Sequence, residues 1–181
     1  MKKTIAFLIG MIVIASLAGA SDATIKFRGS LFSPSDADFK TIYGGGLQFG
    51  AEVEIDFIKG IGIYLGADYF GKSGKMTVTE EATDLTLIPI GAGAFYRYAV
   101  GPGGFIVGAG LHYVIYHENN VLGPVNTGGM GFEAKAEGFL NVAPKIRAFV
   151  FGKFSSCSMT PVDLTFNVGG LEFGAGLGFK I

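Results

Sequence analysis

The segment Val168–Ile181 reads VGGLEFGAGLGFKI, and its final eleven residues alternate between two kinds of residue with a period of two. If it is a β-strand, one face carries only apolar side chains, those of Leu171, Phe173, Ala175, Leu177, Phe179 and Ile181. The other face carries Glu172, Lys180 and three glycines. A soluble sheet buries the apolar face and exposes the charges, whereas a membrane-spanning barrel does the reverse. The face that meets water therefore decides the fold.

The first 20 residues have the pattern of a secretory signal peptide. Lys2 and Lys3 precede an uncharged run at residues 5–17, and small residues follow at 18–20. The run is shorter than the ~20 residues that a membrane-spanning helix needs. We therefore expect residues 1–20 to be a signal peptide cleaved after Ala20, with cleavage after Ala23 as the alternative. Residues 21–181 then form one domain.

The composition narrows the class of protein. Hydrophobic residues make up 49% of the chain and the mean hydropathy is +0.46, yet no later uncharged run is long enough for a spanning helix. The only other structure that a bilayer admits is a closed β-barrel. Without Lys2 and Lys3 the chain has 12 basic and 15 acidic residues, which gives no reason to expect nucleic acid. The single Cys157 excludes a disulfide scaffold.

Eight segments with two-residue periodicity predict eight strands, at residues 24–32, 44–57, 61–80, 84–98, 105–117, 130–141, 145–157 and 164–181. Three connections are short, and these lie at 58–60, 99–104 and 142–144. The loops around 33–43, 118–129 and 158–163 are longer, and the second hairpin extends far before it turns near 80–83. This pattern predicts an all-β fold, an eight-stranded antiparallel up-and-down transmembrane β-barrel with both termini in the periplasm.

Within each strand the charged residues share one face. They are Lys26, Arg28, Glu52, Glu54, Asp56, Asp68, Arg97, Glu133, Lys135, Glu137, Arg147, Lys153, Glu172 and Lys180. The interior of an eight-stranded barrel is only just wide enough for side chains to fill it. The opposite faces carry four to six large apolar groups per strand and would overfill that interior, so we expect the charged faces to point inward.

Seven of these fourteen residues are basic and seven are acidic. An unpaired charge in a lumen of low dielectric is costly, so the balance predicts a network of interior ion pairs that plugs the barrel. If the turn of the third hairpin is centred near Ala143, Glu133 lies opposite Lys153. A water-filled pore takes about 16 strands, which one copy of this chain cannot supply.

With these features the mature chain resembles the small eight-stranded outer-membrane barrels, the family of OmpX and of the OmpA membrane domain. Its last strand is similar to the family's assembly signal at Leu177, Phe179 and Ile181, although the signal usually ends in Phe. The resemblance implies a location in the cell outer membrane and contact with its lipids and lipopolysaccharide. It also implies recognition by the outer-membrane insertion machinery during biogenesis.

Other candidate sites are weaker. His112 is predicted to point inward, and a lone histidine is no metal site. Membrane lipases of this architecture use a serine and a histidine, but nothing singles out one of Ser155, Ser156 and Ser158. We therefore expect no enzyme, metal or cofactor.

Two further features of the sequence concern the parts outside the membrane. Ser35, followed by Asp38 three residues later, predicts the start of a short helix in the first long loop. Cys157 is either an inert thiol or a site of pairing between molecules.

The sequence favours a structural or surface-interaction protein whose loops are the working parts. The expected outer loops sum to a charge of −4, which disfavours a polyanionic partner; their charged residues are Asp36, Asp38, Lys40, Lys72, Lys75, Glu80, Glu81, Asp84, Glu118 and Asp163. A narrow OmpW-like conduit for small hydrophobic molecules is the alternative, and a lipid-modifying enzyme is a third reading. The external ligand is not specified by the sequence.

Overall fold

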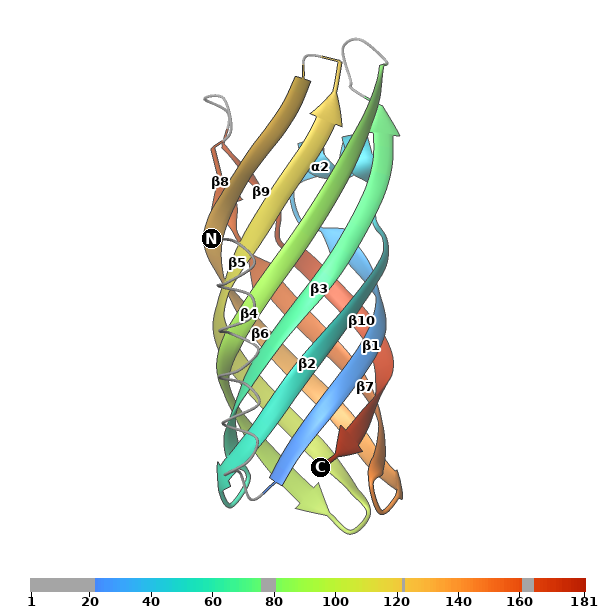
Figure 1. Ribbon diagram of the computed structural model, residues 1–181, viewed down its shortest axis with the longest axis vertical. Helices are drawn as coiled ribbons and strands as arrows, with labels where there is room; N and C mark the ends of the chain where they lie inside the picture. The colour runs from blue at the N-terminus through green and yellow to red at the C-terminus, as the bar shows by residue number, and fades with distance from the viewer. Residues whose placement is uncertain (1–21, 76–80, 122, 161–164) are drawn as a thin grey trace.

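The computed structural model describes residues 22–75, 81–121, 123–160 and 165–181 (Figure 1). The expected signal peptide at 1–20 lies outside the described residues, as do residues 76–80 of the second hairpin and part of the last long loop. None of the described helices is long and apolar enough to cross a membrane.

Eight strands form a closed antiparallel barrel. They are β1 (Asp22–Pro34), β2 (Gly46–Ile58), β3 (Ile61–Lys75), β4 (Ala82–Val100), β5 (Gly103–Asn120), β6 (Gly123–Ala143), β7 (Ile146–Ser156) and β10 (Gly170–Lys180). Each strand pairs with its neighbour in sequence, and β1 closes the barrel on β10 with Phe27 opposite Leu177. Figure 1 shows a tall cylinder of tilted strands in which β1 begins and β10 ends at the lower end. The predicted fold class is confirmed.

The three short connections all lie at the lower end. The β2–β3 turn has positive φ angles at Lys59 and Gly60, +38° and +86°, which suits a two-residue hairpin loop. The β6–β7 turn lies at Pro144 and Lys145, one to two residues later than expected, and an irregularity between Asn141 and Ala143 precedes it. Proline at the first central position sets the backbone angle that a turn requires.

The shifted turn changes the register of the third hairpin. Glu133 faces Ser155, and Lys135 faces Lys153. The expected pairing of Glu133 with Lys153 was therefore wrong by two residues, although both side chains do point into the barrel.

At the upper end the strands continue past the predicted boundaries. The expected loop at 118–129 is largely strand, because β5 and β6 remain paired up to Asn120 opposite Gly123. The expected strand 164–181 is divided into β9 (Phe166–Asn167), which pairs with β8 (Ser158–Met159), and β10. Figure 1 shows β3 to β6 rising highest. We call the upper ends of β3 to β6, together with β8, β9 and the helix described next, the outer lobe.

The short helix of the first long loop is present as α2 (Ala37–Tyr43). Its N-cap is Asp36 and not Ser35, since the Asp36 carboxylate accepts hydrogen bonds from the backbone N–H groups of Asp38 and Phe39, both at 3.0 Å. Phe39 and Tyr43 are buried and fix the helix over the barrel mouth.

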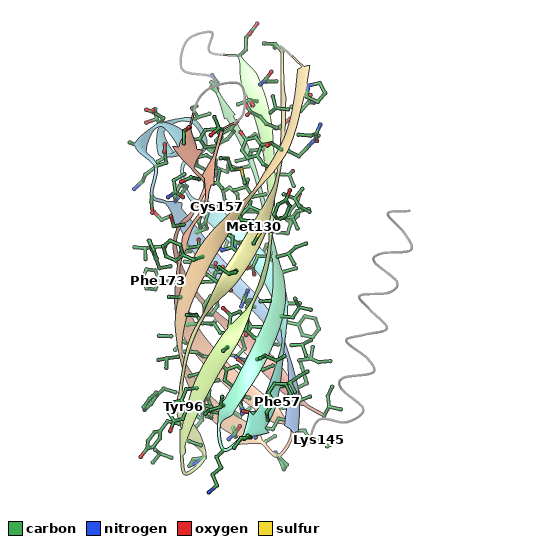
Figure 2. The ribbon with its side chains drawn as sticks, turned by 90° about the vertical axis from the view of Figure 1, so that its left-hand side faces the viewer. Phe57, Tyr96, Met130, Lys145, Cys157 and Phe173 are labelled. Atoms are coloured by element: carbon green, nitrogen blue, oxygen red, sulfur yellow. The ribbon has the colours of Figure 1, made fainter. Side chains whose placement is uncertain are left out.

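The outside of the barrel is an apolar belt. On β5 the outward side chains from Phe105 to Ile115 are apolar and exposed, and the polar His117 and Asn119 follow. That span of about 11 residues matches a transmembrane strand. Figure 2 shows Phe173 of β10 projecting outward from the wall. The apolar face of Val168–Ile181 thus meets lipid, while Glu172 is buried in the lumen.

Candidate functional site

The lower half of the lumen holds a network of ion pairs centred on Glu54 of β2. Its carboxylate lies 2.6 Å from Lys26 Nζ and 2.7 Å from an Arg97 guanidinium nitrogen. Lys135 Nζ and an Arg147 nitrogen are also close, at 3.5 and 3.8 Å. Glu54 is fully buried, so four cations from four other strands surround one carboxylate.

A second arm of the network climbs the lumen from Glu52. Arg28 lies 2.8 Å from both the Glu52 and the Asp68 carboxylates. Lys153 Nζ then joins Asp68 at 2.6 Å and Glu172 at 2.8 Å. The cations bridge carboxylates from different strands, which ties the barrel wall together across its interior.

The structure brings twelve of the fourteen predicted residues into this one network. Six are basic and six acidic: Lys26, Arg28, Glu52, Glu54, Asp56, Asp68, Arg97, Lys135, Glu137, Arg147, Lys153 and Glu172. Glu133 instead lies 3.7 Å from His112 Nδ1, and Lys180 lies at the end of β10 opposite Thr24. The formal charges of this network therefore sum to zero.

Inward aromatic side chains fill the spaces between these charges. Lys135 Nζ lies 3.8 Å from the ring centroid of Tyr64, and the Arg147 guanidinium carbon lies 4.3 Å from that of Phe139. The charges in the sequence do not reveal these rings, although Phe149 and Phe151 lie on the same face of β7 as Arg147. A Cβ at Gly176 would lie 2.5 Å from the Phe149 ring, so glycine makes the room that the aromatic layer needs.

Above the charges, the lumen is apolar, which the sequence analysis did not predict. The cluster comprises Phe32, Phe39, Tyr43, Phe70, Leu85, Leu87, Val114, Tyr116, Cys157, Met159 and Val168. We call this cluster the apolar layer. The alternation within β5 does indicate this layer, because Val114 and Tyr116 follow the inward-pointing His112 in steps of two and so lie on the same face. A cavity of about 20 Å³ lies between the apolar layer and the charged residues below it, and it has room for about one water.

At the top, Glu118 of β5 stands beside the apolar layer. Its carboxylate accepts hydrogen bonds from the Tyr116 hydroxyl, from Thr83 Oγ1 at 2.9 Å and from Asn120 Nδ2 at 3.2 Å. Burial favours the neutral acid, but these hydrogen bonds outweigh it and lower the pKa of Glu118 below its usual range. Glu118 is therefore a carboxylate at neutral pH. Burial raises the pKa of the Tyr116 phenol, which stays neutral.

The other predicted site residues lie apart. His112 and Ser155 line the same small cavity, but within the described residues no hydrogen bond joins His112 to a serine. Cys157 is a free thiol and is buried, which favours the inert thiol over pairing between molecules. In the described part of the chain no cluster of three His, Cys, Asp or Glu side chains offers a metal site.

The residues of the predicted assembly signal lie on the outer face at the end of β10. Leu177, Phe179 and Ile181 are exposed to the lipid side, and the Phe179 ring contacts that of Phe27 edge-on at 6.3 Å. The Ile181 N–H also donates to the Ala23 carbonyl at 3.0 Å. The residues of the signal thus lie at the seam where β10 closes the barrel on β1.

No family model matches the chain, and no curated protein matches it in sequence. Among solved structures it is similar to the outer membrane protein OprG from Pseudomonas aeruginosa, with a TM-score of 0.71 and 14% identity over 90% of this chain and 96% of that one. Neisserial surface protein A gives 0.61 and 18%, over 90% and 99%. The outer membrane protein W of E. coli gives 0.56 and 12%, over 90% and 98%.

The chain has the fold of the small eight-stranded outer-membrane β-barrels. These likenesses are all below 25% identity and establish the fold alone. An outer-membrane location follows from this fold together with the apolar belt that encircles the barrel.

Proposed function

We propose that this protein is an outer-membrane barrel with a closed lumen, and that its outer lobe is a surface-interaction module. The observation that carries the proposal is the filling of the lumen by two successive layers. The charged and aromatic layer occupies the lower half and the apolar layer the upper half, with room for about one water between them. Such an interior supports a rigid stalk and not a pore.

The outer lobe supports the interaction role. Strands β3 to β6 carry it above the apolar belt, and α2 is held there by its N-cap at Asp36. Asp36 also accepts from the Asn167 backbone N–H at 3.2 Å, so the first and last outer loops are joined. An ordered surface of this kind presents side chains to a partner at low entropic cost. Lipids and lipopolysaccharide contact the belt below, and the insertion machinery recognises β10.

Planar-bilayer recording tests the closed lumen. We expect no stable openings of porin size at any voltage that the bilayer tolerates, because the interior charges are paired and the space around them is filled. A 16-stranded porin reconstituted in the same lipid is the positive control. Long-lived openings of comparable conductance contradict the proposal.

One observation favours the second candidate function, a conduit for small hydrophobic molecules. Ladder pairing between β3 and β4 runs from Ile61 to Ala67 and resumes at Phe70, and the unpaired stretch of β4 contains Pro89. Proline has no N–H to donate to the ladder. The gap lies beside the apolar layer, so an apolar molecule that entered from the outer lobe has a weak seam through which to reach lipid.

A Pro89→Val variant tests that conduit. It restores a backbone donor while it keeps an apolar side chain against Val114. If the seam is an exit, wild-type protein in vesicles speeds the transfer of an apolar dye into the bilayer and the variant does so more slowly. Equal rates with wild type, variant and protein-free vesicles remove this candidate.

A further inference from the structure

A pocket of about 150 Å³ opens at the top of the outer lobe, where α2, β5 and β9 meet. Aromatic rings form its walls. The Phe39 centroid lies 5.1 Å from that of Tyr43 and 6.3 Å from that of Phe166, and the Tyr116 centroid lies 5.7 Å from that of Phe166. Four rings from three separate elements thus surround one small space.

Two carboxylates line the pocket, Asp38 of α2 and Glu118 of β5, and Glu118 is the one that stands among the rings. Glu118 lines it beside Tyr116, and all of its hydrogen bonds come from neutral donors. Among the described residues no Lys or Arg lies within ion-pair distance of Glu118, in contrast to the lumen, where every carboxylate of the network contacts a cation. Hydrogen bonds thus hold the Glu118 carboxylate in place, but no described cation neutralises its charge.

The faces of aromatic rings are negative, so rings that surround a cation attract it, and the attraction grows where water is excluded. A carboxylate among such rings adds a Coulomb attraction for the same ligand. The cavity is smaller than the roughly 300–1,000 Å³ of sites for drug-sized molecules, so its occupant has few heavy atoms. We propose that this pocket binds a small organic ammonium ion, with Phe39, Tyr43, Tyr116 and Phe166 as the cage and Glu118 as the counter-ion.

Other ligand classes fit less well. An anion meets Glu118 and the negative ring faces without a compensating positive charge from any described residue in the pocket. A divalent metal ion such as Ca²⁺ takes six or more oxygen ligands, whereas this pocket offers two carboxylates, Asp38 and Glu118, among walls that are mainly aromatic. A neutral apolar molecule is accommodated by the rings but leaves the charge of Glu118 unused, and the experiment below separates it from the ammonium ion.

The inference rests on the proposed function in one respect, that the outer lobe faces the cell exterior. Its ligand chemistry is independent of whether the lumen is closed. A conductance measurement that revealed a pore would overturn the closed lumen and leave the pocket in place, whereas the binding measurement below judges the pocket alone.

Calorimetry with a matched pair of ligands tests the proposal on the whole folded barrel. Choline and 3,3-dimethyl-1-butanol have the same shape and differ in that the quaternary nitrogen is replaced by carbon. The protein is held in maltoside micelles, because phosphocholine and amine-oxide detergents carry a competing head group. We expect saturable binding of choline that is at least about tenfold tighter than that of the alcohol.

Three variants assign the binding to the pocket. Glu118→Gln keeps a hydrogen-bond acceptor and removes the charge, and Phe166→Leu removes one ring; each should weaken choline binding by about tenfold. Asp84→Asn makes the same change of charge on the same lobe, but Asp84 lies outside the pocket and is held by Ser73 Oγ at 2.6 Å, so affinity should be unchanged. The ligand pair needs no variant and stays informative if Glu118→Gln fails to fold. Equal affinity for choline and the alcohol, or no saturable binding of choline, overturns the proposal.

Discussion

Lys135 and Lys153 lie directly opposite each other in the β6–β7 ladder, yet their ammonium groups bind different carboxylates. Lys135 Nζ lies 2.5 Å from Glu52, and Lys153 Nζ lies 2.6 Å from Asp68. Like charges opposed across a ladder destabilise a sheet. Here Glu52 and Asp68 reach them from β2 and β3, so the ion pairs form across the lumen and compensate for an unfavourable pairing within the wall.

We therefore predict strong coupling between Asp68 and Lys153. Asp68→Asn leaves Arg28 and Lys153 without their shared carboxylate, and its cost is about 3 kcal/mol in the free energy of unfolding. After Lys153→Gln, the same Asp68 substitution should cost less. A double-mutant cycle on urea unfolding in lipid vesicles measures the difference, which we expect to be at least about 1 kcal/mol.

The pair Glu133 and Lys153 supplies the control for that cycle. These residues are not opposed in the ladder, and Glu133 lies beside His112 instead. Glu133→Gln combined with Lys153→Gln should show clearly weaker coupling than the Asp68 pair. If the Glu133 cycle gives the larger coupling energy, the register of the third hairpin described above is wrong.

The sequence was sufficient to predict the barrel because the charges of each strand lie on one face. An error in register does not change which residues share that face. The sequence was insufficient to predict which charges pair with each other. The displaced turn at Pro144 moves every pairing in the third hairpin by two residues. Lys135 pairs with Glu52, 83 residues earlier in the chain, and that contact depends on how eight strands close. No local pattern contains this information.

The upper half of the lumen was missed for a different reason. Charged residues identify the inward face of a strand only in the segments that contain them. The apolar layer has almost no charged residues, so its inward faces were not identified. Leu85 and Leu87 share the parity of Arg97 in β4, so extending that parity upward would have placed them inside. The aromatic cage depends on α2 and β9, whose positions follow from tertiary contacts such as that of Asp36 with Asn167 and not from periodicity.

Cys157 should be unreactive in the folded protein. Burial within the apolar layer shields the thiol from reagents in solution. We expect maleimide to leave Cys157 unlabelled in folded barrels and to label it fully in urea. As a control, an Asn119→Cys, Cys157→Ala protein carries its thiol on the exposed face of β5 and should react within the first sampling time. Rapid labelling of native Cys157 contradicts the packing of the apolar layer.

The mature protein should begin at Ser21 and fractionate with the outer membrane. In β1, Asp22 pairs with Asp56 and Ala23 with Ile55, so cleavage after Ala20 retains the whole strand. The alternative cleavage after Ala23, with Thr24 as the first residue, removes these partners at the barrel seam. Mass spectrometry of the protein from the outer-membrane fraction distinguishes the two N-termini, and retention of Met1 contradicts a cleaved signal peptide.

Asp36 should make the order of α2 dependent on pH. A helix of seven residues is too short to be stable alone, and the Asp36 carboxylate satisfies two of its free N–H groups. Hydrogen bonds from the backbone N–H groups of Phe39, Asn167 and Asp38 lower the pKa of Asp36 despite some desolvation. A depressed folded pKa means that the stabilisation is complete above the unfolded pKa of about 3.9. It is lost as pH falls through the lower, folded value.

Hydrogen exchange of the α2 amides, corrected for intrinsic rates, measures this effect. Asp36→Ala should speed exchange at neutral pH about fivefold, which corresponds to about 1 kcal/mol for a lost N-cap. Asp36→Asn keeps an acceptor oxygen but does not titrate, so its exchange should be protected at neutral pH and should not change on acidification. The amides of β5 within the membrane serve as an internal reference for global unfolding. If wild type and Asp36→Asn lose protection in α2 over the same pH range, another group governs the helix and the assignment of Asp36 as its titrating cap is wrong.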